Sequence, residues 1–387
     1  MRRAALVFLS ACGAGLLVLR GASQYAERRH PVNPITAKYG ISLAAFYPEL
    51  SSQDIEQLLR ETWSRPLILT SEGVREAPYR GTYIHVSEDG FREVPEQGPW
   101  PPDRHRYFTV FLFGGSTVFN YGVPDNQTMA AHLQARLSAR RSPLPPRVYN
   151  FGVGYYASTQ ERERFEALIR RGMVPDLAVF VDGMNDFHYT RGEPPVASQS
   201  ADLSVRAPGL RAVLMQRLQQ SLLASALRRG RNVLLGYYTT HRHQRSLPFV
   251  GQAVSSAVER YYNDRVLLQH VIDRYLANKA AIESLAQRAG VQTLFVWQPV
   301  PTYRYDLRLH PFASDGFGQH TYGVFGYPLM AEEVRRHPLG NNFQWCADIQ
   351  ANAASPLYLD KVHYSGRLSQ LVADCIVAGL PGRHAVK

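Results

Sequence analysis

Between residues 107 and 297 the sequence alternates short runs rich in β-branched and aromatic residues with longer segments of helical pattern. The strand-like runs cover residues 107–113, 147–151, 176–181 and 291–297, and the helical patterns cover about 125–140, 159–171 and 253–289. Strands that alternate with helices form a parallel sheet covered by helices on both faces. The sequence therefore predicts an α/β fold.

Three regions of different character make up the predicted domain organisation. Residues 1–24 are a membrane segment, 25–100 a tether and N-terminal extension, and 101–387 a catalytic domain with an insertion at 187–252. A helix is expected in the extension, because Ser51 precedes Asp54 by three residues in capping-box spacing, ahead of the apolar Ile55, Leu58 and Leu59.

The membrane segment contains an uncharged apolar run at residues 4–19, between Arg3 and Arg20. The run has no polar face, which a surface helix of a globular domain would need. It is longer than a typical signal-peptide core and slightly shorter than the ~17 to 25 residues that span a bilayer comfortably. We expect an uncleaved anchor with the domain exported to the extracytoplasmic (periplasmic) side. A cleaved signal peptide, or a lipoprotein box at Leu9-Ser10-Ala11-Cys12, is the alternative.

The basic charge of the chain is mostly local. The formal net charge is +11, and residues 191–250 contain nine arginines, no lysine and only Glu193 and Asp202 as acids, which gives 9 − 2 = +7. Part of this stretch has leucines at helical spacing. We expect that this stretch is a lid or interfacial helix that faces anionic lipid headgroups or an anionic polymer. The alternative is a solvent-exposed insertion with a structural role only. Export and the lack of a nucleic-acid motif argue against a nucleic-acid partner.

Cysteine and histidine spacing predicts no metal site. Cys12, Cys346 and Cys375 do not have the spacing of zinc or iron–sulfur motifs, and His241 and His243 have no nearby carboxylate or cysteine. In an oxidising space Cys346 and Cys375 either pair or remain two buried thiols.

Polar blocks follow the predicted strands, where ligands of open α/β sheets bind. They are Gly114-Gly115-Ser116-Thr117, Asn150-Phe151-Gly152-Val153-Gly154-Tyr155, Gly183-Met184-Asn185-Asp186 and, near the C-terminus, Asp360-Lys361-Val362-His363. A serine nucleophile needs a base that takes its proton, and the base needs a carboxylate that orients it. The oxyanion that forms needs fixed hydrogen-bond donors. Asp360 can orient His363 within one turn, so that the imidazole faces Ser116. Each block alone is more typical of a turn or cap than of a catalytic site. Their joint order favours a catalytic site.

In this order the blocks resemble the SGNH/GDSL hydrolase superfamily, in particular its membrane-anchored bacterial members with a Gly-Gly-Ser-Thr nucleophile block. The resemblance runs from about Asp89-Gly90-Phe91-Arg92 to the final helix, with the insertion as an addition. It implies a three-layer α/β/α sandwich without metal or organic cofactor. It also implies roles for single residues: Ser116 as nucleophile, His363 as base, Asp360 as its partner, and the Asn185 amide with the Ser116 N–H in the oxyanion hole.

The second block departs from the family pattern. Five residues after Asn150, where the family usually has its oxyanion glycine, this chain has Tyr155, and Gly154 comes one residue earlier. A backbone N–H is present whatever the side chain, so Gly154 and Tyr155 both remain candidates for the donor. Loss of one such donor typically costs about 10²- to 10³-fold in rate.

The predicted function is a serine esterase that uses an acyl-enzyme on an ester, O-acetyl or another small acyl group, of an envelope carbohydrate or lipid. The alternatives are an O-acyltransferase on an exported polysaccharide, working with membrane partners, and a non-catalytic polysaccharide-binding or assembly protein of the same fold. Gln298, after the fourth strand, is either part of the cleft or a strand terminator, and we consider Tyr303, Tyr305 and His310 as a sugar-binding wall. The sequence does not indicate the oligomeric state.

Overall fold

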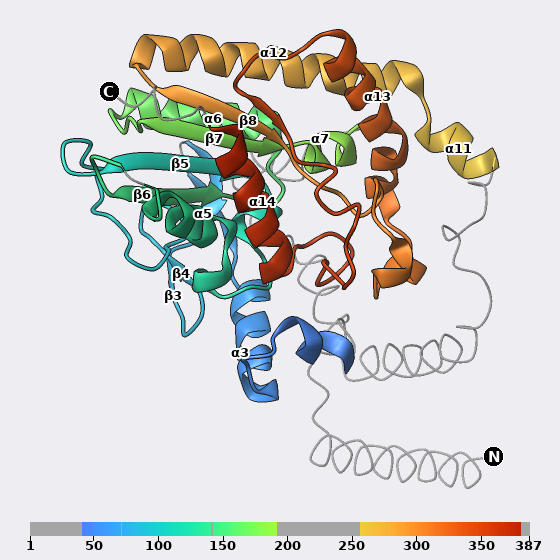
Figure 1. Cartoon of the computed structure of the whole chain (residues 1–387), viewed down its shortest axis with the longest axis horizontal. Helices are drawn as coiled ribbons and strands as arrows, with labels where there is room; N and C mark the ends of the chain where they lie inside the picture. Colours follow the sequence, from blue (N-terminus) through green and yellow to red (C-terminus); the bar gives the residue numbers. More distant parts are fainter. Residues whose placement is uncertain (1–40, 71, 141, 192–255, 381–387) are drawn as a thin grey trace, which may run out of the picture.

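A five-stranded parallel sheet flanked by helices forms the centre of the protein (Figure 1). The structure, a computed structural model, describes residues 41–70, 72–140, 142–191 and 256–380. The strand order is β6-β5-β7-β8-β9. The strands are β5 (Phe108–Gly114), β6 (Pro146–Gly152), β7 (Leu177–Asp182), β8 (Gln292–Trp297) and β9 (Phe343–Trp345). The predicted α/β fold with a central parallel sheet is confirmed.

Each face of the sheet has its own apolar cluster, because successive strand side chains point to opposite faces. Val110 and Leu112 of β5 pack in one cluster with helices α5 and α14, and Phe111 and Phe113 pack in the other with α6 and the C-terminal half of α12. The helices of the α/β part are α4 (Ser116–Phe119), α5 (Met129–Ser138), α6 (Ser158–Arg170), α7 (Met184–His188), α11 (Ser256–Tyr262), α12 (Arg265–Ala289), α13 (Tyr322–Arg336) and α14 (Gly366–Gly379).

Some elements differ from the predicted ones. The helical pattern at 253–289 forms two helices, because Asp264 accepts a hydrogen bond from the Leu267 N–H and caps α12. Strand β9 was not predicted, because it has only three residues and no apolar run.

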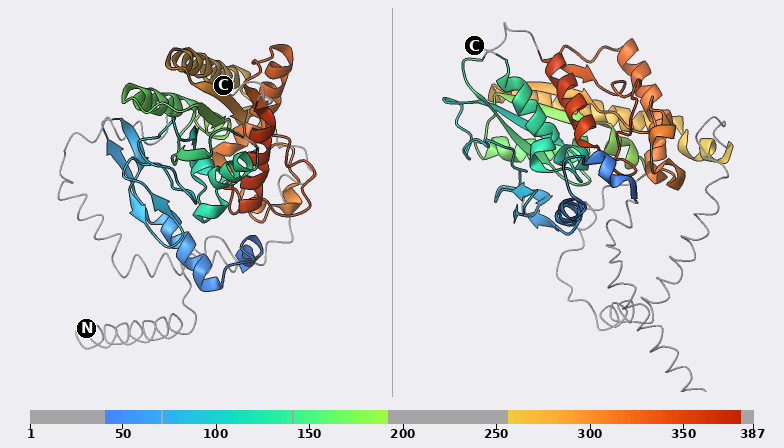
Figure 2. Two further views of the ribbon diagram at one scale, coloured as in Figure 1. Left: turned by 60° about the vertical axis from the view of Figure 1, so that its left-hand side comes forward. Right: turned by 60° about the horizontal axis from the view of Figure 1, so that its bottom comes forward.

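The N-terminal extension packs beside the α/β sandwich (Figure 2). It contains α3 (Ser52–Trp63), with the predicted Ser51–Asp54 capping box, and two hairpins, β1 (Leu67–Thr70) with β2 (Gly73–Glu76) and β3 (Tyr79–Arg80) with β4 (His85–Val86). Its apolar cluster includes Leu58 and Leu59 of α3, and also Phe119 and Leu359, which lie next to the Ser116 and Asp360 blocks. Short 3₁₀ helices complete the fold: η1 (Ile41–Phe46), η2 (Asp125–Gln127), η3 (Leu307–Leu309), η4 (Ala313–Asp315) and η5 (Gly318–Thr321).

Cys346, just after β9, and Cys375 of α14 form a disulfide. Of the two states that the sequence left open, the structure therefore has the paired one. The predicted membrane segment at 1–24 and residues 192–255 of the Arg-rich insertion lie outside the described residues. Among the helices within the described ranges, none combines the length and the apolar character of a membrane span.

Candidate active site

Ser116 begins helix α4 directly after strand β5, with Gly114 and Gly115 forming the turn. The turn is too crowded for side chains: a Cβ at Gly114 would collide with Val118, and one at Gly115 would lie 2.5 Å from the Asn185 Nδ2. Strand register brings Gly114 of β5 beside Gly152 of β6 and Val181 of β7. The ends of three neighbouring strands, and the polar blocks that follow them, therefore meet at one edge of the sheet.

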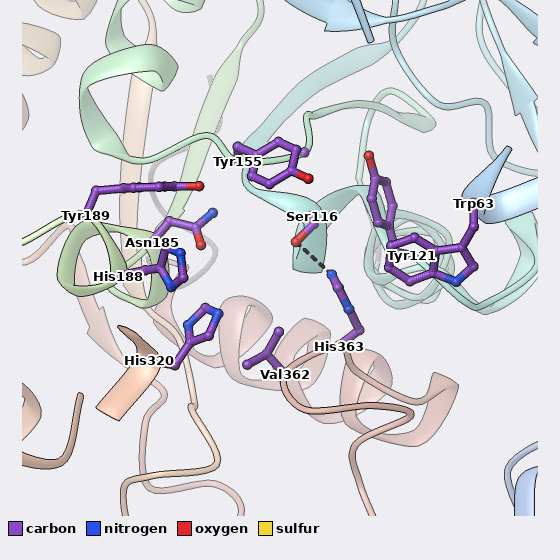
Figure 3. Close-up of a pocket in the computed structure, with 11 residues that line it drawn as sticks. Trp63, Ser116, Tyr121, Tyr155, Asn185, His188, Tyr189, His320, Val362 and His363 are labelled. Atoms are coloured by element: carbon purple, nitrogen blue, oxygen red, sulfur yellow. Dashed lines mark hydrogen bonds between the residues drawn. The ribbon is translucent and has the colours of Figure 1, made fainter. Parts of the chain in front are cut away.

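Ser116, His363 and Asp360 form a hydrogen-bonded chain (Figure 3). His363 Nε2 lies 2.9 Å from Ser116 Oγ, and His363 Nδ1 lies 2.7 Å from Asp360 Oδ2. Because a carboxylate only accepts, Nδ1 carries the imidazole hydrogen and Nε2 is left to accept from the Ser116 hydroxyl. The contact that the sequence predicted between these three residues is present.

Asp360 is held in its ionised form. Burial alone would raise its pKa, but the neighbouring His363 and the hydrogen bonds that Asp360 accepts lower the pKa well below its ordinary value. Its Oδ1 accepts from the backbone N–H groups of Val362 and His363, at 2.9 and 2.8 Å. The carboxylate thus both fixes its own loop and orients the imidazole.

Two aromatic side chains hold the His363 ring in place. Tyr121 stacks on it with ring centroids 5.5 Å apart, and Trp63 of the N-terminal extension meets it edge-on at 5.4 Å. Together with the Asp360 hydrogen bond, these contacts leave the imidazole little freedom to turn away from Ser116.

The structure separates the two candidate donors of the second block. The Gly154 N–H donates to Glu76 Oε1 at 3.2 Å and is therefore occupied. The N–H groups of Tyr155 and Ser116 have no hydrogen-bond partner in the part of the chain that the structure describes. Tyr155 has φ +71°, in the left-handed region that costs a non-glycine residue about 1–2 kcal/mol.

Asn185 lies in the first turn of α7 and points toward the Ser116 turn (Figure 3). Its Nδ2 donates to the Tyr156 carbonyl at 2.7 Å, which fixes the amide and leaves its second hydrogen for a ligand. The next residue, Asp186, has the structural role of a cap: it accepts from the Gly183 N–H at 3.0 Å and from the Ser158 hydroxyl at 2.6 Å.

Two buried polar residues support the loops beneath the site. Arg92, fully buried, donates to the carbonyls of Phe119, Asn120 and Val123 in the chain that follows Ser116. Asn150 Nδ2 donates to the Val118 carbonyl at 2.9 Å. Both residues belong to the sequence blocks quoted above, and both stabilise the loop geometry without lining the pocket.

Glu76 is a residue of the site that the sequence analysis missed. It is buried on β2, forms an ion pair with Arg65 at 3.1 Å, and accepts from the Tyr121 hydroxyl at 2.7 Å in addition to the Gly154 N–H. One carboxylate thus connects the N-terminal extension to the second block and to the aromatic ring that stacks on His363. No local pattern marks Glu76, because Gly154 is 78 residues away.

A cavity of about 150 Å³ opens beside Ser116. Its wall is formed by Trp63, Ser116, Tyr121, Gly154, Tyr155, Asn185, His188, Tyr189, His320, Val362 and His363. His188 and His320, with ring centroids 4.1 Å apart, were not singled out from the sequence, since neither belongs to a motif. Burial lowers the pKa of both, so they stay neutral near pH 7.

The proposed sugar-binding wall after β8 does not line this cavity. Gln298 is buried and accepts from Thr117 Oγ1 at 2.7 Å and from the Tyr364 hydroxyl at 2.8 Å, so it has a structural role. Tyr305 and His310 are buried against Tyr358 instead of facing the pocket. Across the described ranges, no group of three or more His, Cys, Asp or Glu side chains is arranged to hold a metal ion.

No protein-family model and no curated protein matches the sequence. Among solved structures, a putative lipolytic protein of the G-D-S-L family from Desulfitobacterium hafniense is 10% identical, and the match covers 70% of this chain and 99% of that one, with a TM-score of 0.35. A putative acylhydrolase from Bacteroides fragilis is 13% identical, and the match covers 72% of this chain and 88% of that one, with a TM-score of 0.33. A catalytic mutant of an acetylxylan esterase from Geobacillus stearothermophilus is 14% identical, and the match covers 70% of this chain and 93% of that one, with a TM-score of 0.33.

These proteins are named as lipolytic proteins, acylhydrolases and esterases. In the order of its sequence blocks, in its parallel sheet and in the contact of Ser116 with His363 and Asp360, the chain resembles the SGNH/GDSL hydrolase superfamily.

Proposed function

We propose that the protein is a serine ester hydrolase that works through an acyl-enzyme. The observation that carries this proposal is the hydrogen-bonded chain from Ser116 Oγ through His363 to Asp360, next to N–H groups of Ser116 and Tyr155 that have no partner among the described residues. A structural turn would need neither the oriented imidazole nor unpaired donors beside it.

In the proposed mechanism Ser116 Oγ attacks the ester carbonyl while His363 Nε2 takes the hydroxyl proton. The tetrahedral oxyanion accepts hydrogen bonds from the backbone N–H groups of Ser116 and Tyr155 and from the Asn185 amide. His363 then gives the proton to the leaving alcohol, and Asp360 stabilises the imidazolium between the two transfers. Water repeats the sequence on the acyl-enzyme and releases the acid. A sugar hydroxyl in place of water would make the same site an O-acyltransferase.

The cavity supports a small acyl group, such as acetyl, as the part of the substrate that is buried. Its volume of about 150 Å³ is well below the ~300 to 1,000 Å³ of sites that enclose a drug-sized ligand. We propose an ester of an envelope carbohydrate or lipid as the substrate. We also propose an exported domain tethered by residues 1–24, a location that the Cys346–Cys375 disulfide supports, since disulfides persist in oxidising compartments.

Labelling of the full-length protein in detergent with a fluorophosphonate tests the proposal. We expect covalent labelling and hydrolysis of p-nitrophenyl acetate by the wild type, and loss of both in Ser116→Ala and His363→Ala. Ser138→Ala changes an exposed serine at the end of α5 and should label like the wild type. Labelling of the Ser116→Ala variant to the same extent as the wild type would refute the enzyme hypothesis. A wild type that neither labels nor hydrolyses p-nitrophenyl acetate would refute it as well.

A further inference from the structure

Tyr155 combines a backbone conformation that favours glycine with a side chain that has no structural partner. Its φ of +71° is in the left-handed region, where glycine is accommodated without strain. The residue is 49% exposed, although it belongs to the wall of the cavity. Within the described residues the side chain has neither a hydrogen bond nor a ring contact. Tyr155 is thus a strained residue that is about half exposed and has no polar or aromatic partner among the described residues, which indicates a function for its side chain.

The other aromatic residues of the cavity wall are engaged in packing. Tyr121 and Trp63 contact each other and His363, and Tyr189 as a residue is only 9% exposed. Figure 3 shows the Tyr155 ring close to Ser116, on a different side from His363. Among the tyrosine and tryptophan rings of the cavity wall, the Tyr155 ring is therefore the one that remains available to contact a substrate bound at Ser116.

The size of the cavity decides which part of the substrate meets this ring. About 150 Å³ accommodates a small acyl group but not the alcohol part of a larger ester. The alcohol part must lie at the mouth of the cavity, where it is partly exposed to solvent. A pyranose suits this place, because its C–H face is apolar and its hydroxyls remain solvated, whereas a hydrocarbon chain there would stay largely exposed to water.

We propose that Tyr155 is a specificity-determining residue, whose exposed ring stacks on the sugar of a small-acyl carbohydrate ester while its backbone N–H faces the oxyanion. The inference rests on the proposed ester hydrolase function. It narrows the substrate from carbohydrate or lipid to carbohydrate, and it explains why a tyrosine is tolerated at a left-handed position.

The test compares two acetate esters with the full-length protein in detergent: methyl 6-O-acetyl-glucopyranoside, which offers a sugar ring, and ethyl acetate, which offers none. The measured quantity is the ratio of kcat/KM for the two esters. We expect Tyr155→Gly to lower this ratio about tenfold, through KM of the sugar ester, and Tyr155→Phe and Tyr155→Trp to keep it within about twofold of the wild type, because both retain a flat ring. The thermal midpoint of Tyr155→Gly should not fall, since glycine removes backbone strain.

Tyr261→Ala is the matched control, because Tyr261 is 47% exposed on α11 and does not belong to the cavity wall; its ratio should equal that of the wild type. An unchanged ratio in Tyr155→Gly, or a ratio in Tyr155→Phe as low as that of Tyr155→Gly, would overturn the stacking proposal. A wild type that cleaves ethyl acetate but not the sugar ester overturns it as well, and leaves the ester hydrolase standing. A wild type that cleaves neither ester and does not label with fluorophosphonate overturns the proposed function itself.

Discussion

Acidification to pH 5 should destabilise the fold next to the Asp360 block, because His310 is buried in its neutral form. His310 stacks on Tyr358 with ring centroids 5.3 Å apart, and its Nδ1 accepts from the Phe312 N–H at 3.1 Å. Burial lowers the pKa of His310 from 6.5 to about 4. Since Tyr358 is two residues before Asp360, this ring supports the loop that holds the triad carboxylate.

The sign and size of the effect follow from proton uptake. Between pH 7 and pH 5 the unfolded chain binds a proton at this histidine while the folded chain does not, so stability falls as the pH falls through 6.5 toward 4. From these two pKa values the loss between pH 7 and pH 5 is about 2 kcal/mol. Urea unfolding at the two pH values, followed by far-ultraviolet circular dichroism, measures the free energy directly.

The His310→Asn variant isolates this contribution from other titrating groups. Asparagine keeps an acceptor near the place of Nδ1, and the cavity that it leaves costs the same at both pH values, so only the titration of the imidazole is removed. We expect the pH-dependent loss to be about 2 kcal/mol smaller in the variant than in the wild type. Equal losses in the two proteins would refute the claim that His310 remains neutral in the fold.

Two further predictions concern the oxyanion side of the site and the disulfide. Asn185→Ala should lower kcat for p-nitrophenyl acetate by about 10²- to 10³-fold with the thermal midpoint nearly unchanged; an unchanged rate would remove the Asn185 amide from the oxyanion hole. Replacing Cys346 and Cys375 together by alanine opens a loop with a sequence separation of 29 and should cost about 3.5 kcal/mol in urea unfolding. A double variant as stable as the wild type would show that the disulfide does not constrain the unfolded chain.

The sequence predicted the parts of the fold and site that have local signatures. The four strand runs are continuous and apolar, and Ser116, Asn185 and the Asp360–His363 pair lie at strand ends or three residues apart, so their positions could be read from short windows. The choice between Gly154 and Tyr155 as oxyanion donor could not be predicted in this way. The residue type that the family usually has favoured Gly154, whereas the count from Asn150 favoured Tyr155, and only the Glu76 contact shows which N–H is occupied.

The misses depend on contacts between distant parts of the chain. Strand β9 is three residues long and forms only because β8 offers an edge for pairing, and α13 contains Pro328, which speaks against a helix when the sequence is considered alone. His188 and His320 come from helices far apart in sequence and meet only in the folded cavity wall. The spacing of residues along the chain does not predict such pairs.

Glu76 shows how far the active site depends on the N-terminal extension. A buried carboxylate is costly unless it is paired and hydrogen-bonded, and Glu76 meets this condition only by contacting Arg65 within the extension and Tyr121 and Gly154 outside it. The same contacts hold the ring that stacks on His363 and occupy the N–H that would otherwise compete with Tyr155 for the oxyanion. Trp63, from the same extension, contacts His363 directly. The extension and the α/β sandwich therefore build the site together, although the nucleophile, the base and the proposed oxyanion donors all come from the sandwich.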